Sequence, residues 1–183
     1  ELASGVTIAV GTAEVTSVTP AIAFLGMETE FTIAGPGLAS GVAADRVLFT
    51  TSSCEEGVVA TKTVENGVVA MTFSQAVETM RMCVSFSNGA FRLVTPTVSV
   101  YGVSAIAPTS AVVGKPTTVT FSGVGIADGD NVAFVAAGDE CSAAVASGVV
   151  ESSSVTVVLS GVSETMEVCY AFQQSSVGMV KQP

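Results

Sequence analysis

Apolar and polar positions along the chain alternate in short runs instead of following a helical period. In the first half, runs of strand length lie near residues 15–19, 29–34, 45–51, 58–63, 67–73, 80–87 and 91–95. In the second half, they lie near residues 103–107, 117–122, 131–137, 144–147, 154–159, 166–173 and 177–181. Gly, Pro, Asp or Asn separates the runs, and the pairs Asn66-Gly67 and Asn88-Gly89 are typical of hairpin turns. The pattern predicts an all-β protein.

The second half of the chain repeats the first. VTSVTP at residues 15–20 matches VSAIAP at 103–108, and FTIAGPGLASG at 31–41 matches VTFSGVGIADG at 119–129, both at an offset of 88 positions. ETMRMCVSF and ETMEVCYAF, beginning at Glu78 and Glu164, close the two copies. This many ordered matches indicates a tandem duplication. The predicted organisation is an extension strand at residues 1–14, a first domain at 15–96, a linker at 97–102 and a second domain at 103–183.

About seven short strands in each copy favour an immunoglobulin-like β-sandwich. The order of the motifs is more specific than that class. A V-x-x-h-x-P opening, in which h is apolar, precedes a glycine, then TFSGVGIADGDNVAFV, then a cysteine and finally VCYAF. This order resembles the IPT/TIG family, the compact immunoglobulin-like domains of cell-surface receptors and extracellular repeat proteins. The resemblance covers both copies, and it implies a binding or scaffolding module without catalytic activity.

Each predicted domain contains two of the four cysteines. Cys54 and Cys83 are 29 positions apart, and Cys141 and Cys169 are 28 apart. Four cysteines allow three pairings. The duplication selects one disulfide per domain, Cys54–Cys83 and Cys141–Cys169, because each copy holds both partners at equivalent positions. A metal site is disfavoured by the absence of histidine and of any C-x-x-C motif, and buried free thiols are the remaining alternative.

The charge and hydropathy of the sequence limit the classes of partner that we expect. The chain has 16 acidic residues, six basic ones and a net charge of −10, and the basic residues are scattered, so no nucleic-acid partner is expected. No apolar run approaches the roughly 18–20 residues of a membrane span.

The even number of cysteines fits an oxidising compartment. Because the chain starts at Glu1 without Met, we interpret it as a mature, secreted or surface-exposed protein whose signal peptide has been removed.

Catalytic chemistry is not predicted, and neither is a cofactor. Without histidine the usual general base is missing. The carboxylate pairs lie in predicted turns or strand starts, which favours solvated acids over a hydrolytic pair; they are Glu28/Glu30, Glu55/Glu56, Asp128/Asp130 and Asp139/Glu140. Asp128 and Asp130 in ADGDNV form a weak calcium candidate. An inter-strand turn explains the same residues, and the first copy has ASGVAAD at this place.

Threonines next to prolines are candidate O-glycan acceptors on an extracellular protein. Exposed residues that favour β-strands explain the same positions equally well. The candidates are Thr19, Thr95, Thr97, Thr109 and Thr117.

The N-terminal extension has no counterpart at the start of the second copy. Its even positions include Leu2, Val6, Ile8 and Val10, whereas its odd positions carry small residues or Thr. This alternation predicts a strand with one face that needs burial. The strand either folds onto the first domain of its own chain or adds to the open edge or groove of a neighbouring subunit, as donor strands do.

Two functions fit these features. The first is a structural subunit of an extracellular filament, appendage or surface coat, in which the N-terminal strand joins subunits head to tail into a homo-oligomer or helical filament. The alternative is an adhesin or receptor ectodomain module that binds a protein or glycan.

Overall fold

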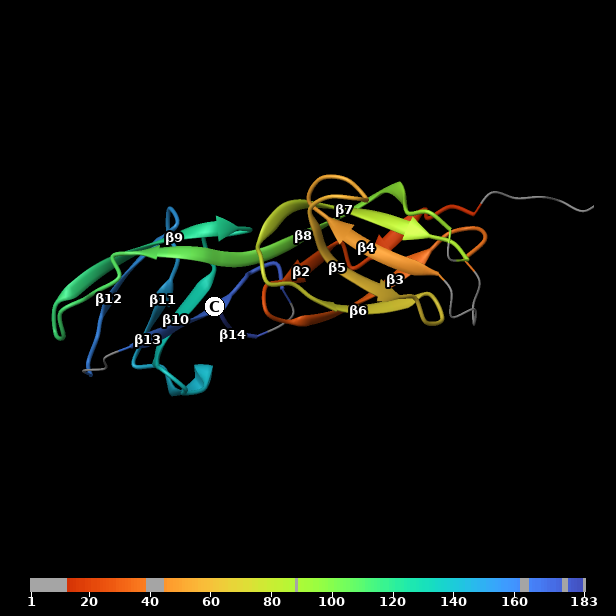
Figure 1. Ribbon diagram of the computed structural model, residues 1–183. Coiled ribbons are helices and arrows are strands. Elements are labelled where there is room, and N and C mark those ends of the chain that lie inside the picture. Colours follow the sequence, from red (N-terminus) through yellow and green to blue (C-terminus); the bar gives the residue numbers. More distant parts are fainter. Residues whose placement is uncertain (1–12, 39–44, 88, 162–164, 176–177, 183) are drawn as a thin grey trace, which may run out of the picture. The chain divides into compact units, whose positions relative to one another are not determined.

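The computed structural model describes residues 13–38, 45–87, 89–161, 165–175 and 178–182 (Figure 1). The predicted assembly residues Leu2, Val6, Ile8 and Val10 lie outside the described residues. The elements of the first repeat are β1 (Ser17–Thr19), β2 (Ile22–Phe24), β3 (Glu28–Ala34), β4 (Arg46–Thr50), β5 (Val58–Thr63), β6 (Val68–Thr72) and β7 (Val77–Ser85). They are followed by β8 (Arg92–Ala107), β9 (Pro116–Val124), β10 (Asn131–Ala136), the 3-10 turn η1 (Cys141–Ala143), β11 (Ala146–Val149), β12 (Ser154–Val158), β13 (Met166–Ala171) and β14 (Val180–Lys181).

The all-β prediction is confirmed, and two elements were not expected. β2 was missed because its three residues follow Pro20 and Ala21 without an alternating pattern. β8 is one strand of 16 residues that runs through residues 97–102, where the sequence predicted a linker. The hairpin turn at Asn66 and Gly67 is confirmed: both have positive φ, 53° and 78°, and Glu65 pairs with Val68 across it.

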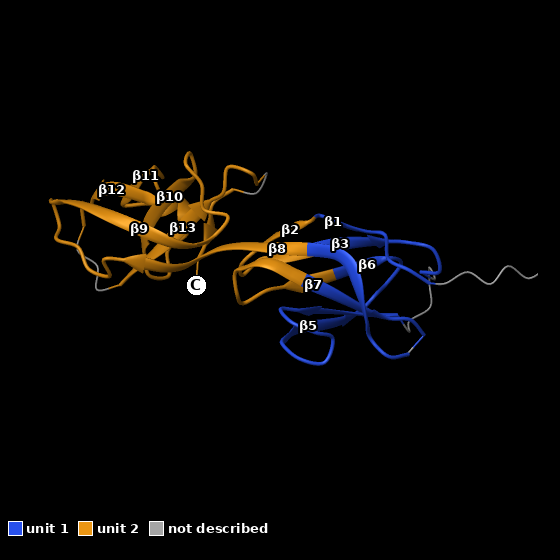
Figure 2. Ribbon diagram, turned by 90° about the horizontal axis from the view of Figure 1, so that it is seen from above, with its two compact units in different colours: residues 1–20, 30–69, 81–97 blue, residues 21–29, 70–80, 98–183 orange. Residues whose placement is uncertain are grey.

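The chain divides into two compact units, which Figure 2 shows in blue and orange. Unit 1 comprises residues 1–20, 30–69 and 81–97, and unit 2 comprises residues 21–29, 70–80 and 98–183. These units interleave along the sequence, whereas the repeat predicts contiguous domains. The boundaries at residues 15–96 and 103–183 therefore stay a prediction.

Unit 1 is built around β4, which pairs antiparallel with both β5 and β7. β1 pairs antiparallel with β3. Alternate residues of β1 and β3 are buried, whereas β4 is buried continuously from Val47 to Thr50. The Phe31 and Phe49 rings lie 5.4 Å apart between their centroids, and Val15 and Val47 are fully buried with them. β1 and β3 thus have the half-polar, half-apolar strand pattern that the sequence predicted.

Unit 2 contains a four-stranded sheet in the order β11-β10-β13-β14 and the antiparallel series β12-β9-β8. β2 adds to β8 in parallel. The core of the unit contains Phe121, Tyr170 and Phe172, and the Phe172 ring lies 4.7 Å from that of Tyr170 and 5.3 Å from that of Phe24. The two layers of strands are visible on the left of Figure 1. Each repeat therefore forms an immunoglobulin-like β-sandwich.

Two glycines, Gly35 and Gly123, make equivalent close backbone contacts at the same offset of 88 positions as the sequence repeat. A Cβ at Gly35 would clash with the carbonyl oxygen of Glu14, and a Cβ at Gly123 would clash with that of Gly102. Residues 14 and 102 are themselves 88 positions apart. The glycine is required because an earlier part of the backbone passes directly over it.

Both predicted disulfides are confirmed. Cys54 is bonded to Cys83 and Cys141 to Cys169, each with 5.7 Å between the Cα atoms. Cys83 and Cys169 are fully buried, so in each repeat the bond links a core strand to the segment that follows the central strand of the sheet.

Candidate functional site

The predicted calcium residues are engaged by the protein itself. Asp130 is 1% exposed, and both of its carboxylate oxygens accept hydrogen bonds. Oδ2 accepts from Ala127 N and from the Tyr170 hydroxyl, each at 2.8 Å, and Oδ1 accepts from Gln173 N at 2.7 Å. Asp128 Oδ1 accepts from Ser152 N at 2.7 Å. These bonds favour a structural role for both carboxylates over calcium binding.

The pKa of the Tyr170 hydroxyl depends on its burial and on its contact with Asp130. Its ring is fully buried and its hydroxyl donates to Asp130. Burial, the hydrogen bond and the negative charge of Asp130 all raise the pKa of the Tyr170 hydroxyl. The phenol therefore stays protonated far above its ordinary range in the folded protein.

The O-glycan candidates are accessible in most cases. Thr19, Thr95, Thr97 and Thr109 are exposed, and Thr117 is partly buried. Accessibility is required for modification but does not demonstrate it, and the O-glycan prediction stays a prediction.

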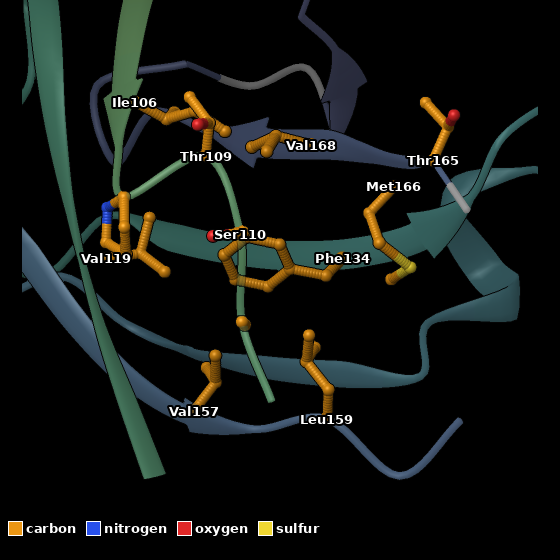
Figure 3. Close-up of a pocket in the computed structure, with 12 residues that line it drawn as sticks. Ile106, Thr109, Ser110, Val119, Phe134, Val157, Leu159, Thr165, Met166 and Val168 are labelled. Atoms are coloured by element: carbon orange, nitrogen blue, oxygen red, sulfur yellow. The ribbon is translucent and has the colours of Figure 1, made fainter. Parts of the chain in front are cut away.

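An apolar groove with a volume of about 310 Å³ lies in the second repeat. Phe134, Val157 and Val168 come from β10, β12 and β13, and their side chains gather with those of Leu159 and Met166 (Figure 3). One wall is formed by residues 108–111, which follow β8. We call this cavity the core groove, because its lining consists of inward-facing residues of the sandwich.

In the first repeat, residues of β8 occupy the place that is equivalent to this groove. Residues 99–101 of β8 pair in parallel with β2, and β7 lies on the other side of β8. Val98 and Val100 of this part of β8 are 1% and 0% exposed. They fill the core between β2 and β7. The equivalent position in the second repeat, between residues 108–111 and the start of β13, is the core groove.

The exposed fractions of equivalent side chains show how the two repeats differ at this place. Met80 and Phe73 of the first repeat are 0% and 1% exposed, whereas Met166 and Leu159 of the second are partly exposed. Ala23 is fully buried, whereas its equivalent, Ala111, is exposed. Val112 beside it is 62% exposed. The groove thus presents core residues to solvent, at a free-energy cost that a strand lying in it would remove.

The backbone beside the groove is held in the same way in both repeats. Gly26 N donates to Phe73 O at 2.9 Å, and its equivalent, Gly114 N, donates to Leu159 O at 3.0 Å. Both segments also begin with a cis peptide bond, at Pro20 and Pro108. Residues 109–113 therefore lie where β2 lies in the first repeat, with or without a neighbouring strand.

The hydrogen bonds that β2 makes to β8 have no counterpart among the described residues of the second repeat. Leu25 N donates to Tyr101 O at 2.8 Å, and Ser99 N donates to Ala21 O at 2.9 Å. The equivalent groups are Val113 N and Thr109 O, which form no hydrogen bond within the described part of the chain. The groove is consequently bordered by main-chain groups that are unpaired within the described part of the chain.

β14 occupies the part of the β13 edge that adjoins the groove. Gln182 N donates to Val168 O, and Gln182 Oε1 accepts from Val103 N, both at 2.9 Å. Lys181 Nζ lies 2.7 Å from Glu167 Oε2. This contact, with a hydrogen bond from Gly138 N, lowers the pKa of Glu167 below its ordinary value. A second cavity of about 190 Å³ lies between Gln182 and Met166 and continues the groove toward β14.

The sequence pattern does not predict the core groove. Residues 97–102, where it predicts a linker, belong instead to the strand that fills the first repeat. The predicted assembly residues and the groove are not brought together in the described residues, since residues 1–12 lie outside them.

Among the described residues, no group of three or more potential metal ligands is present. No helix in the same part of the chain is long and apolar enough to cross a membrane.

Comparison with known proteins assigns no family. No family model matches the chain, and no curated protein matches it. Among solved structures, the BSP domain of a biofilm-associated protein is similar at 12% identity and a TM-score of 0.35, over 92% of this chain and 28% of that one. Murine CEACAM1b is similar at 11% identity and a TM-score of 0.34, over 94% and 96% of the two chains. The human OSCAR ligand-binding domain is similar at 12% identity and a TM-score of 0.31, over 93% and 94%. Likenesses of this size assign neither a ligand nor a partner.

Proposed function

We propose that this chain is a structural subunit of an extracellular filament, appendage or surface coat, made of immunoglobulin-like domains of the IPT/TIG type. Subunits join head to tail when the N-terminal strand of one adds to the next. The observation that carries the proposal is the core groove, an apolar cavity in the second repeat beside residues 109–113, whose Val113 N and Thr109 O are unpaired within the described part of the chain. Unpaired main-chain groups of this kind can bind a strand from another chain.

The geometry of this contact favours a filament over a closed pair. The donor strand lies at the N-terminus and the acceptor groove lies in the second repeat, so the two surfaces are different. A contact between two different surfaces leaves one free donor and one free acceptor at the ends of every assembly. Such a contact extends into a fibre unless its rotation closes a ring.

The disulfides and the net charge of −10 support the extracellular location that the proposal requires. Disulfides persist in oxidising compartments, and a high like charge keeps unassembled subunits apart at low ionic strength. Neither feature selects a filament over an adhesin. The apolar lining of the groove supports the filament, because a strand from a neighbouring subunit can bury apolar side chains against it.

Sedimentation velocity and negative-stain microscopy of the purified chain test the proposal. We expect elongated particles whose length increases with protein concentration. The double variant Ile8→Asp/Val10→Asp is expected to remain monomeric, because it places charges on the apolar face of the donor strand. The matched control is Thr7→Asp/Ala9→Asp, which adds the same charge to the opposite face and is expected to assemble.

Two results contradict the proposal. The first is a wild-type chain that stays monomeric at all concentrations. The second is an assembly whose size is the same in both aspartate variants, which would show that the N-terminal face is not involved. A monomer that binds a cell-surface protein or a glycan would support the adhesin alternative.

A further inference from the structure

We propose that Asn66 is a site of spontaneous covalent modification, at which its side-chain amide is converted to the carboxylate of aspartate or isoaspartate. The site lies in the hairpin turn between β5 and β6, where Asn66 and Gly67 have φ of 53° and 78°. The reaction consumes water and releases ammonia, and it requires no enzyme or cofactor. It concerns the first repeat whether or not the chain assembles, so it is independent of the proposed function.

The reacting atoms are neighbours along the main chain. Gly67 N attacks Cγ of Asn66, a carbon–nitrogen bond forms, and the amide nitrogen leaves as ammonia with the proton of the Gly67 N–H. The product is a cyclic imide, which water then opens. Cleavage at the main-chain carbonyl carbon leaves residue 67 attached through the side chain, which is isoaspartate, whereas cleavage at Cγ gives aspartate.

Both reacting groups are available in this turn. Asn66 is exposed, and Gly67 has no Cβ to hinder the approach of its nitrogen. The hydrogen bonds of the turn run between Glu65 and Val68, and within the described part of the chain Gly67 N donates to no acceptor. A main-chain nitrogen without an acceptor can lose its proton and attack without first breaking a hydrogen bond.

A second asparagine-glycine pair, at Asn88 and Gly89, has a bonded nitrogen instead. Gly89 N donates to Phe86 O at 2.9 Å, and Gly89 O accepts from the Ser85 hydroxyl at 2.6 Å. Asn88 itself lies outside the described residues. Because both main-chain groups of Gly89 are held, its nitrogen must be released by a local opening before it can attack.

The chain has three asparagines, and the third is hindered in another way. Asn131 begins β10 and is followed by Val132, whose β-branched side chain crowds the attacking nitrogen. The second repeat has Ser152 and Ser153 in the turn equivalent to that of Asn66, so it cannot react there. The structure therefore favours Asn66 over the other asparagines.

The modification changes both the charge and the backbone of the first repeat. Either product adds a carboxylate that is ionised at neutral pH, since the ordinary pKa of aspartate is about 3.9. Isoaspartate also adds one carbon to the main chain between residues 66 and 67. Gly67 O accepts from Ile33 N at 2.7 Å, and Glu65 pairs with Val68 across the turn. A longer main chain displaces these contacts, so isoaspartate is expected to destabilise the first repeat.

Peptide mapping by mass spectrometry tests the site during incubation of the full-length chain at mildly alkaline pH. One sample is folded, and another is unfolded in urea with its disulfides reduced. In the folded chain we expect conversion of Asn66 to exceed that of Asn88 by about tenfold, the order of the penalty for opening the bonds of Gly89 first. In the unfolded chain we expect similar rates, because both asparagines precede glycine.

Three results would overturn the proposal. They are equal conversion of Asn66 and Asn88 in the folded chain, faster conversion of Asn88, and no conversion of Asn66 in the folded chain while the unfolded chain reacts to completion.

Two variants test the effect on stability, which urea denaturation before and after incubation measures. Asn66→Ser/Gly67→Ser copies the turn of the second repeat and is expected to keep its urea midpoint, whereas the midpoint of the unchanged chain falls. An equal fall in this variant would place the damage elsewhere. Asn66→Asp adds the carboxylate without the extra carbon, and we expect the isoaspartate form to have a lower midpoint than this variant. Equal midpoints would overturn the predicted effect of the longer main chain.

Discussion

Met80, Phe73 and Ala23 of the first repeat are fully buried, whereas Met166, Leu159 and Ala111 have the same places in the second repeat and are reached by solvent. The backbones around these residues follow the same path and share the turn at Gly26 and Gly114. The difference lies in β8, which fills the first core with Val98 and Val100. The two sandwiches thus differ in whether a strand of the described residues covers this place in the core.

The two repeats also differ at the end of the strand that carries the second cysteine. Asp45 Oδ1 accepts from Ser87 N at 2.9 Å, and its equivalent, Asp130 Oδ1, accepts from Gln173 N. The second repeat adds the Tyr170 hydroxyl to this carboxylate, whereas the first has Val84 at the position of Tyr170. The shared bond fixes the end of the strand, and the second repeat adds a buried phenol whose pKa is raised by burial and by Asp130.

The largest effect is expected where the repeats are alike. Replacing Cys54 and Cys83, or Cys141 and Cys169, by alanine is expected to lower the free energy of unfolding of the repeat concerned by about 3.6 kcal/mol, since loops of similar length are opened. Urea denaturation, with hydrogen exchange of β4 and β10 amides to follow each repeat, measures both effects. A loss twice as large in one repeat would show that the disulfides are not equivalent.

The second-largest effect on stability is expected to differ between the two repeats. Met80→Ala is expected to cost about 3 kcal/mol, because it leaves a cavity in a closed core. Met166→Ala is expected to cost about 1 kcal/mol or less in the monomer, since solvent already reaches that side chain. Urea denaturation at a concentration where the chain is monomeric tests the pair. Equal losses would mean that the groove is closed in solution.

Tyr170 gives a pH dependence that only the second repeat has. Its folded-state pKa is raised above the ordinary value of about 10, so above that pH the unfolded chain loses a proton that the folded protein keeps. The stabilisation is complete below about pH 10, and stability then falls by up to about 1.4 kcal/mol per pH unit as the pH rises. Absorbance of phenolate in a Tyr101→Phe variant follows Tyr170 alone, because the chain has two tyrosines.

The control for this effect is Tyr170→Phe, which is expected to remove the steep loss above pH 10 and to lower stability modestly at neutral pH. Ionisation of Tyr170 near pH 10 in the folded protein would contradict the burial and the bond to Asp130.

The smallest effect concerns the hairpin turns. Ser152 and Ser153 have φ of 48° and 58°, in the same turn that Asn66 and Gly67 form in the first repeat. Asn and Gly adopt positive φ at less cost than Ser. Exchanging Ser152-Ser153 for Asn-Gly is expected to stabilise the second repeat by about 1 kcal/mol, and the reverse exchange to destabilise the first similarly. Thermal unfolding measures both. Loss of stability on the Asn-Gly exchange would show that Ser152 and Ser153 make contacts that outweigh backbone strain.

Much of the architecture was predictable because it depends on local pattern. Alternating runs and turn residues indicated the strands, and the duplication paired the cysteines because equivalent positions in two copies must lie in equivalent places. The hairpin at Asn66 and Gly67 followed from residues that tolerate positive φ. β2 could not be predicted, since its three residues are held by bonds to β8, about 77 positions later in the chain.

The sequence by itself determined the all-β class, the two copies and their disulfides, because each depends on the order of side chains along the chain. Only the tertiary structure decided that residues 97–102 belong to one long strand, and that the second repeat leaves Met166 and Leu159 uncovered. The physical reason is that a buried position is defined by what lies against it. Whether an inward-facing residue is covered depends on a strand supplied from elsewhere in the chain, and local alternation does not record where that strand lies.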